Sequence, residues 1–535
     1  LSRAVLKDKC LPQTTHQRIE HIHESLLFYD EHTFGASESV SDPLCENSQV
    51  QWGEKSAYAW EAVKRTQMLY ETSVGLLQGD LRRGKNPTLT IFNTLNWKRS
   101  EMLTVYIDFE VIPRNQFFEI TDFQGHSLKV QPIRYRREGC YYAIFAEDIP
   151  PMGYKTFEIV FKQPSTDTGT ITINNASIEN HFYKLQLNPD KGTIQSLYDK
   201  ELNCELVDSS SPWELGAFIY EKLGNRDQLA QYRLDDYNRT GLSECRIIDS
   251  SNGPIYQRIL LQGKSPGTDE AFGVNLEIKL YHDTKRIELE YAIKRLPETD
   301  PSGIYVAFPF QLPEGKLAFD VQGGTVISGK NQLEGTSTDW NTVQNFVSVQ
   351  NNQAQIIIGS SLIPLYQLGD INLGKFQYQK QYERPHVYSW VMNNYWNTNF
   401  KASQEGEFRW SYHLTSSVDP SSNLATKFGW SARIPLYARV MPTGTENHKP
   451  TEYSAFHFEK DNFLMTSCTP SKEEGYILLN IREIDGKRTN LRILNEDGQT
   501  IPFTIVNAIE EKLENETSEH IFEGYQNKFI KIKRF

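Results

Sequence analysis

The sequence has few cysteines for its length, six in 535 residues. They are too sparse for a disulfide framework, and they include no Cys-x-x-Cys pair, so no cysteine-based zinc site is visible in the sequence. The chain also lacks an apolar run of about 18 residues, so we expect no membrane span. No segment repeats with a period of about 20–50 residues, which excludes a solenoid or a propeller.

An excess of basic residues is missing too. The chain has 56 Lys and Arg residues and 68 Asp and Glu residues, which gives a net charge of −12. We therefore expect no nucleic-acid partner. Neither an initiator Met nor a signal peptide opens the chain. Its first residues, Leu1 to Leu6, resemble the interior of a structured region. The expectation is that this is a fragment of a longer protein or a processed chain.

The chain does contain material for several folded domains. Hydrophobic residues make up 38 % and aromatic residues 12 %, enough for sizeable cores. Apolar residues of helical period predict a helix over 53–83, and a second helical segment over 13–27. From Thr88 onward, short β-branched and aromatic runs alternate with Gly, Pro, Asn and Asp turns. This pattern predicts strands almost to the C-terminus.

Two polar stretches, 162–169 and 441–450, are linker candidates within the β region. The predicted fold class is mainly β with an N-terminal α-helical bundle segment, and its β part is typical of sandwiches. At about 100–200 residues per domain, a chain of 535 residues holds about three or four domains, and we predict four. They are a helical bundle (1–87), a small β-sandwich (88–165), a large β-sandwich (170–440) and a C-terminal β domain (451–535).

A polar loop between the two helical segments carries the first candidate site. Asp30, Glu31 and His32 follow an apolar run, and Gly35 permits a sharp turn soon after. Such a histidine could bind zinc through one ring nitrogen while a carboxylate orients the other. The alternative is a loop histidine with ordinary hydrogen bonds. The remaining histidines nearby are interpreted as surface residues of a helix: His16, His21 and His23.

A second candidate is the stretch 392–400, which contains four asparagines together with Tyr395, Trp396 and Phe400. Amides both donate and accept hydrogen bonds, and aromatic faces stack on sugar rings, so this mixture suits a carbohydrate surface. The alternative is a polar turn between strands with buried aromatics. The stretch 339–346, which includes Trp340, is a third candidate, interpreted as a loop that runs into a strand. The alternative is a structural turn.

Four segments, in order along the chain, together resemble glycoside hydrolase family 38, the α-mannosidases, of the bacterial type. They are 89–100 (LTIFNTLNWKRS), 178–207, 339–344 and 393–400. The second carries the most specific signals, namely Glu179-Asn180, Gly192-Thr193-Ile194 and Ser196-Leu197-Tyr198-Asp199-Lys200. The resemblance covers most of residues 25–480.

The resemblance implies a zinc-dependent retaining hydrolase that removes terminal α-mannosyl residues from glycans. It implies a supersandwich, like that of mutarotases, for the large β domain. His32 matches a family zinc ligand, but the usual His-Asp pair is His32-Thr33 here. The resemblance implies that substrate contacts come from both candidate stretches: Asp30, Glu31, Thr33, Asn393, Asn394, Trp396 and Asn399.

The resemblance also implies that the zinc site is complete only with an N-terminal catalytic domain that supplies the nucleophile. That domain has no match in these residues, so no catalytic residue is assigned and the chain alone is expected to be inactive. The expected partner is a glycan or oligosaccharide, and homo-oligomerisation stays open. A periplasmic or extracytoplasmic location in a bacterium would rest on the resemblance alone.

Two other functions compete with the hydrolase. One is a non-catalytic carbohydrate-binding or scaffold protein that shares the β domains. The other is a lyase or mutarotase on the same architecture, since fold does not decide function. No Tyr/His or paired-carboxylate constellation supports the latter.

Overall fold

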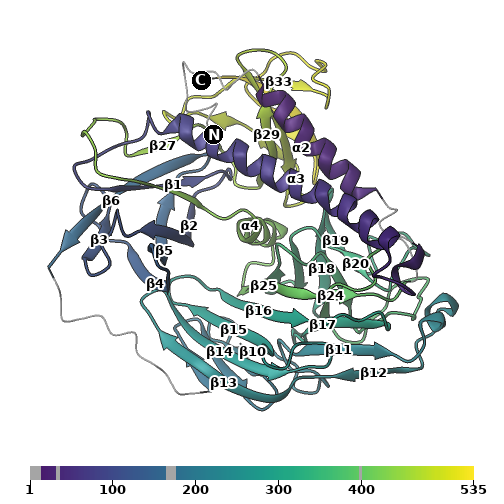
Figure 1. Cartoon of the computed structure of the whole chain (residues 1–535). Coiled ribbons are helices and arrows are strands. Elements are labelled where there is room, and N and C mark those ends of the chain that lie inside the picture. Colours follow the sequence, from purple (N-terminus) through teal and green to yellow (C-terminus); the bar gives the residue numbers. More distant parts are fainter. Residues whose placement is uncertain (1–13, 32–36, 164–175, 397–399, 535) are drawn as a thin grey trace. The chain divides into compact units, whose positions relative to one another are not determined.

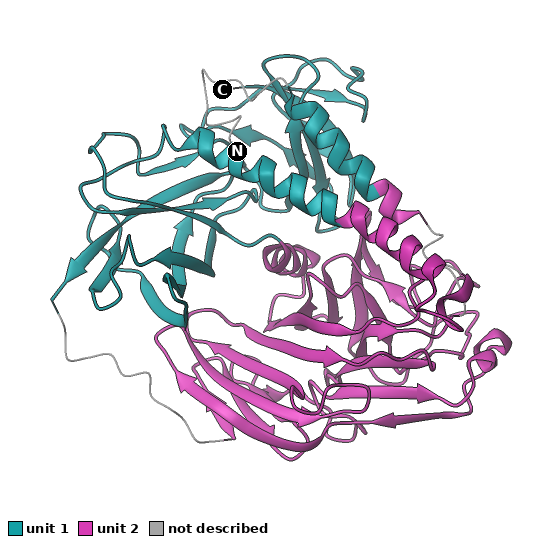
Figure 2. Cartoon of the chain, viewed as in Figure 1, with its two compact units in different colours: residues 1–26, 60–169, 434–535 teal, residues 27–59, 170–433 magenta. Residues whose placement is uncertain are grey.

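The structure is a computed structural model (Figure 1), and it describes residues 14–31, 37–163, 176–396 and 400–534. The chain forms two compact units (Figure 2). Unit 1 comprises residues 1–26, 60–169 and 434–535, and unit 2 comprises residues 27–59 and 170–433. The paired strands within the described residues are antiparallel, and β structure dominates, which confirms the predicted fold class.

Two long helices, α2 (Thr15–Asp30) and α3 (Glu46–Leu77), precede the β region, with a short 3₁₀ turn, η1 (Ser37–Ser39), between them. The prediction of a helix over 53–83 was wrong at both ends. Helix α3 begins earlier because a turn through Cys45, whose amide donates to Asp42 O, starts it. It ends earlier because the chain turns at Gly79, where the Asp80 amide donates to Leu77 O.

Unit 1 contains a small β-sandwich. One sheet has the strand order β26-β1-β6-β27, with β3 also pairing β6, and the other has the order β2-β5-β4. The strands are β1 (Thr88–Asn93), β2 (Arg99–Asp108), β3 (Phe117–Thr121), β4 (Lys129–Tyr135), β5 (Gly139–Ile149), β6 (Gly153–Lys162), β26 (Tyr437–Met441) and β27 (Glu452–Ser454). Leu89, Ile144 and Phe157 lie in the core that both sheets bury. Strand β1 pairs on one side with β26, so that Thr88 lies opposite Met441.

A second core in unit 1 belongs to the C-terminal strands. A four-stranded sheet has the order β29-β30-β35-β33, and two short pairs, β28-β32 and β31-β34, accompany it. The strands are β28 (His457–Phe458), β29 (Phe463–Pro470), β30 (Tyr476–Glu483), β31 (Thr489–Leu491), β32 (Ile493–Leu494), β33 (Phe503–Val506), β34 (His520–Phe522) and β35 (Asn527–Lys533). Apolar residues such as Phe463, Leu479 and Ile530 alternate inward along them.

Unit 2 is built on a nine-stranded sheet with the order β13-β14-β15-β16-β25-β22-β21-β18-β19. Its strands are β13 (Ser243–Asn252), β14 (Tyr256–Lys264), β15 (Val274–Tyr281), β16 (Ile287–Arg295), β18 (Lys316–Val321), β19 (Gly324–Ile327), β21 (Phe346–Gln350), β22 (Gln355–Gly359) and β25 (Gly406–Ser417). Helix α4 (Ser422–Arg433) packs on this sheet, with Ala425 against Phe346 and Ile357.

Two further sheets complete unit 2. The six-stranded sheet has the order β12-β11-β17-β24-β23-β20, and the four-stranded sheet has the order β10-β9-β8-β7. Their strands are β7 (Ser177–Glu179), β8 (Tyr183–Asn188), β9 (Thr193–Asp199), β10 (Cys204–Glu205), β11 (Phe218–Leu223), β12 (Tyr237–Thr240), β17 (Ser302–Phe308), β20 (Asn341–Thr342), β23 (Leu365–Leu368) and β24 (Val387–Asn393), and a 3₁₀ helix, η2 (Arg226–Gln231), follows β11. All three sheets bury residues in one continuous core, including Leu185, Val306 and Leu289. This arrangement is a large antiparallel sandwich.

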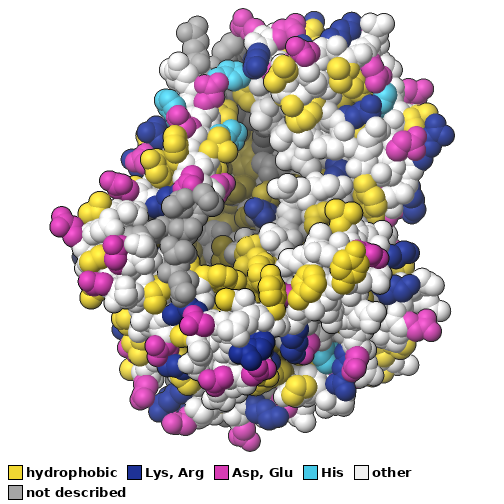
Figure 3. Space-filling model, turned by 90° about the vertical axis from the view of Figure 1, so that its right-hand side faces the viewer, with side chains coloured by type: hydrophobic (Ala, Val, Ile, Leu, Met, Phe, Trp, Pro, Cys, Tyr) yellow, Lys and Arg dark blue, Asp and Glu magenta, His cyan; other side chains and the backbone are white. Residues whose placement is uncertain are grey.

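The two units do not follow the four predicted domain ranges one to one, because unit 1 draws strands from both ends of the sequence. The four ranges therefore remain a prediction. No helix within the described ranges has the length and apolar character of a membrane span. Figure 3 shows hydrophobic and charged side chains interspersed on one face of the molecule.

Candidate functional site

The loop that carries the predicted zinc ligand begins at the end of helix α2. Asp30 is the last residue of that helix, and Glu31 follows it. The Lys55 ammonium group donates to Glu31 O at 2.9 Å and to Glu31 Oε2 at 3.2 Å, which ties the end of α2 to α3. His32 and Thr33 lie outside the described residues. The roles predicted for these four residues stay predictions.

The asparagine-rich stretch begins at the end of β24. Asn393 is half-buried, and its side chain makes no hydrogen bond to any described residue. Its amide is therefore available to a ligand. Trp396 is 43 % exposed. Asn399 lies outside the described residues, so its predicted role remains a prediction.

Asn394 is placed differently, because its buried side chain is committed to the surrounding loops. Its Nδ2 lies within hydrogen-bond distance of Glu298 O, Asp300 O and Ala402 O, at 3.0–3.1 Å, and its Oδ1 accepts from the Ser302 amide at 2.7 Å. These bonds hold two loops together, one before β17 and one before β25. We expect any effect of Asn394 on a ligand to act through those loops.

Aromatic side chains bring the second and third candidate stretches together. The rings of Trp340 and Trp396 meet edge to face, with centroids 5.8 Å apart, and Trp390 contacts both at 5.7 and 6.0 Å. Tyr395 packs on Trp390 and donates a hydrogen bond of 2.6 Å to the fully buried Glu221. The sequence pattern identified both stretches but not their contact, which depends on the neighbouring strands β20, β23 and β24.

A pocket of about 320 Å³ lies within unit 2, near the first candidate loop (30–33) in the sequence and at the end of the second candidate stretch (392–400). Its volume is at the lower end of the range for small-molecule sites, about 300–1,000 Å³. One wall comes from residues 39–52, shortly after His32 in the sequence, and the other from the loops 297–299 and 400–405. Its side chains combine aromatic surface with both signs of charge: Ser39, Trp52, Glu298, Phe400, Lys401 and Glu405. We call it the Trp52 pocket.

The two walls of the Trp52 pocket are in direct contact. The Lys401 ammonium group lies 5.1 Å from the centre of the Trp52 ring, a cation–π contact, and 3.8 Å from Glu405 Oε1. Ser403 joins the two loops, since its hydroxyl donates to Glu405 Oε2 and accepts from the Glu298 amide, both at 3.2 Å. These contacts fix the positions of the hydrogen-bonding groups and of the Trp52 ring in the pocket.

Glu298 has a dense set of partners of its own. Its carboxylate accepts from Tyr220 Oη at 2.9 Å, from Arg295 Nη2 at 2.7 Å and from Ser302 Oγ at 3.2 Å. Burial raises the pKa of Tyr220, and the charge of Glu298 raises it further. The phenol therefore stays protonated and keeps donating, so that the Glu298 carboxylate is fixed in orientation at the pocket wall.

Sequence reasoning missed Trp52, Glu298, Lys401 and Glu405. The turn 297–301, which has a proline at each end and two acids between, was the one available signal. The partners of this turn are too distant in the sequence to be recognised. Within the described ranges, no three His, Cys, Asp or Glu side chains are grouped closely enough to hold a metal ion. Those residues therefore do not fit a complete zinc site.

The fold is a large antiparallel sandwich, and the Trp52 pocket lies among its loops. Residues 178–376 match the family model described as "Glycosyl hydrolases family 38 C-terminal domain". This match confirms the resemblance seen in the sequence, and it covers residues 178–376 of the chain. No curated protein sequence matches the chain.

Two solved structures share the fold across almost the whole chain. An α-mannosidase from Enterococcus faecalis V583 aligns with a TM-score of 0.74 at 12 % identity, over 99 % of this chain and 64 % of that one. A glycosyl hydrolase family 38 protein from Enterococcus faecalis aligns with a TM-score of 0.73 at 13 % identity, over 99 % of this chain and 68 % of that one. The chain thus spans about two thirds of the length of these proteins.

Proposed function

We propose that this chain is the non-nucleophilic part of a retaining glycoside hydrolase that removes terminal α-mannosyl residues from glycans. The observation that carries the proposal is the Trp52 pocket, since its walls continue from the two stretches that the family resemblance marks as substrate-facing. The match of residues 178–376 to the family 38 C-terminal domain supports the reaction class.

The chemistry of the pocket supports a sugar ligand. A pyranose has apolar C–H faces, which pack on an aromatic ring such as Trp52, and hydroxyls that both donate and accept. The carboxylates of Glu298 and Glu405 accept from hydroxyls, and Lys401 donates to them. In this proposal the residues position and desolvate the substrate, while the nucleophile lies outside the 535 residues.

The test is hydrolysis of p-nitrophenyl α-mannoside by the protein expressed from the complete reading frame that encodes these residues. We expect turnover by that protein and none by the 535-residue chain alone. The Trp52→Ala variant should raise KM about tenfold, which corresponds to about 1.4 kcal/mol of lost binding. Trp60→Ala, on the same helix and 72 % exposed, is the matched control and should leave KM unchanged. Sugar binding without turnover in the complete protein would instead favour the scaffold alternative.

We further propose that His32 supplies one zinc ligand, with the remaining ligands outside the described residues. In the complete protein, His32→Ala should lower zinc content, measured by atomic emission, from about one ion per chain to well below half, because each ligand adds to the affinity. His23→Ala, an exposed residue of α2, is the control and should retain the metal. Equal zinc content in the two variants would rule out the ligand assignment.

A further inference from the structure

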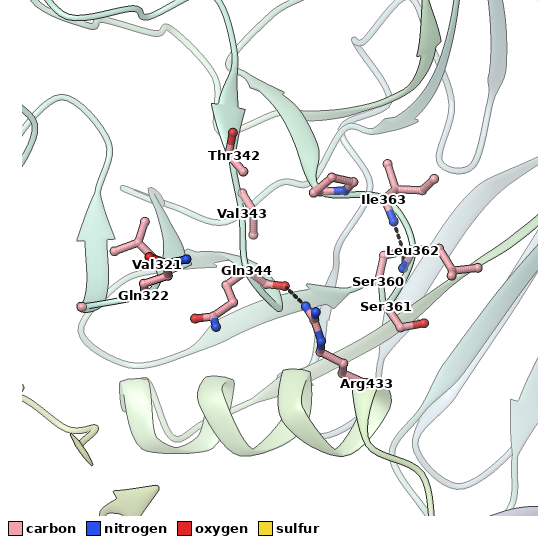
Figure 4. Close-up of a pocket in the computed structure, with 12 residues that line it drawn as sticks. Val321, Gln322, Thr342, Val343, Gln344, Ser360, Ser361, Leu362, Ile363 and Arg433 are labelled. Atoms are coloured by element: carbon pink, nitrogen blue, oxygen red, sulfur yellow. Dashed lines mark hydrogen bonds between the residues drawn. The ribbon is translucent and has the colours of Figure 1, made fainter. Parts of the chain in front are cut away.

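A second cavity in unit 2, of about 690 Å³, opens at the C-terminal end of helix α4 (Figure 4). Its walls are the turn between β18 and β19, the segment 342–344 at the end of β20, and the loop 360–364 between β22 and β23. Arg433, the last residue of α4, points from the helix toward Gln344 (Figure 4). We call this cavity the Arg433 pocket, and it shares no residue with the Trp52 pocket.

Free hydrogen-bond donors gather in the Arg433 pocket. Arg433 Nη1 donates to Gln344 O at 3.1 Å and lies 3.5 Å from Asn345 Oδ1, but Nε and Nη2 bond to no described residue. The side-chain amide of Gln344 makes no hydrogen bond within the described ranges, and its Oε1 is buried without a partner. The Ser361 and Thr342 hydroxyls are likewise unbonded to described residues.

The charge of this cavity is of one sign. Among the described residues that line it, Arg433 is the single charged one. The full 535-residue sequence has a net charge of −12. The buried carboxylate of Asp320 accepts from Asn345 Nδ2 at 3.0 Å, so it offsets part of the Arg433 charge without lining the cavity. A pocket of several free donors and one cation favours a ligand rich in acceptors. Arginine in particular pairs with carboxylate and phosphate through two parallel hydrogen bonds.

The opposite wall is apolar. Leu362, Ile363 and Pro364 form it, and Val343 adds to it from the neighbouring segment. Figure 4 shows Leu362 and Ile363 on the loop across the cavity from Gln344. An inorganic ion would leave this surface wet, whereas a ligand with a carbon skeleton would cover it. The cavity therefore fits an organic anion better than a bare one.

We propose that the Arg433 pocket binds a sugar that carries a carboxylate or a phosphate, with Arg433 holding the oxyanion and the apolar loop packing on the ring. That the ligand is a sugar rests on the proposed function, whereas recognition of the anion does not. The site would let the protein hold an acidic branch of a glycan at a place separate from the Trp52 pocket.

The experiment is calorimetric titration of the full 535-residue chain with glucuronate, mannose 6-phosphate, mannose and inorganic phosphate. We expect the two acidic sugars to bind with a Kd near the millimolar range, and the neutral sugar and the bare ion at least about tenfold more weakly. Arg433→Gln should weaken the acidic sugars about tenfold or more. Arg409→Gln, an arginine that is exposed on β25 of the same unit, should not.

A second variant tests whether binding is lost because the pocket has changed and not because the protein has misfolded. Leu362 is 60 % exposed, so Leu362→Asp should leave the fold intact while placing a negative charge at the rim and abolishing acidic-sugar binding. Equal affinity of the parent and both pocket variants would overturn the proposal, and so would preference for inorganic phosphate over both sugars. Arg433-dependent binding in a protein that lacks mannosidase activity would support the pocket and overturn only the proposed function.

Discussion

Replacing Glu221 by alanine is expected to lower the free energy of unfolding of unit 2 by about 3–5 kcal/mol. Glu221 is fully buried on β11, where Arg239 Nε donates to its Oε2 at 2.5 Å and Tyr305 and Tyr395 donate to its Oε1. Removal of this carboxylate leaves the Arg239 cation in a poorly solvated place with no compensating charge. Chemical unfolding followed by tryptophan fluorescence is the measurement, since most of the tryptophans belong to unit 2.

Two controls separate this effect from a general loss of charge. The exposed ion pair of Asp370 and Lys375 joins side chains that are 59 % and 48 % exposed, so Asp370→Asn should cost less than about 1 kcal/mol. The double variant Glu221→Leu, Arg239→Leu should recover much of the loss, because it removes both buried charges. A Glu221→Ala variant as stable as the parent would contradict the account of the pair.

Unit 2 is also expected to lose stability as the pH falls below about 6.5, by about 2 kcal/mol on reaching pH 4.5. Burial, with Arg286 adding to it, lowers the pKa of His413 on β25 to about 3 from its ordinary value of 6.5. Its Nδ1 lies 2.8 Å from Arg286 Nη2, which fits a neutral ring that accepts this bond. Between pH 6.5 and 3 the unfolded chain binds a proton that the folded chain excludes, so acid favours unfolding.

A neighbouring carboxylate extends the same trend to lower pH. Burial alone would raise the pKa of Glu288, but Lys279 and Arg286 lower it well below 4.5, so its stabilising effect is lost as pH falls past that value. Urea unfolding at pH 7.5, 5.5 and 4.5 measures the slope. His413→Gln should flatten it above pH 4.5, and His181→Gln, at an exposed position in the same unit, should not. An unchanged slope in His413→Gln would assign the acid sensitivity to other groups.

The buried network around His413 shows where sequence reasoning stops. The alternation over 287–293 predicts a strand, and β16 (Ile287–Arg295) confirms it. Polar residues of an alternating strand usually face solvent, yet Glu288 is only 8 % exposed. The reason is cross-strand pairing, which sets Lys279 of β15 and His413 of β25 directly opposite Glu288. Local pattern gives the strand, but the partners of a buried charge come from strands distant in the sequence.

In the candidate site too, the sequence identified some of the residues but not the contacts between distant segments. Composition alone identified the stretch 392–400, because asparagine and aromatic residues are concentrated there, and it identified Trp340 as well. Composition did not predict that Asn394 would join two loops. An asparagine looks the same in a sequence whether its side-chain amide binds a ligand or the backbone. Trp52 could not be predicted either, because its contact with Lys401 requires helix α3 to meet a loop far along the chain.

The pairing of β1 with β26 has a consequence for synthesis of the protein on the ribosome. Strand β1 is made early, but its partner Met441 emerges only after all of unit 2 has been translated. At about 5–20 residues per second, that interval lasts tens of seconds. During it, one edge of β1 has no native partner, and an open strand edge is a template for pairing with other chains. The nascent small sandwich is therefore exposed to aggregation at that edge until β26 has been made.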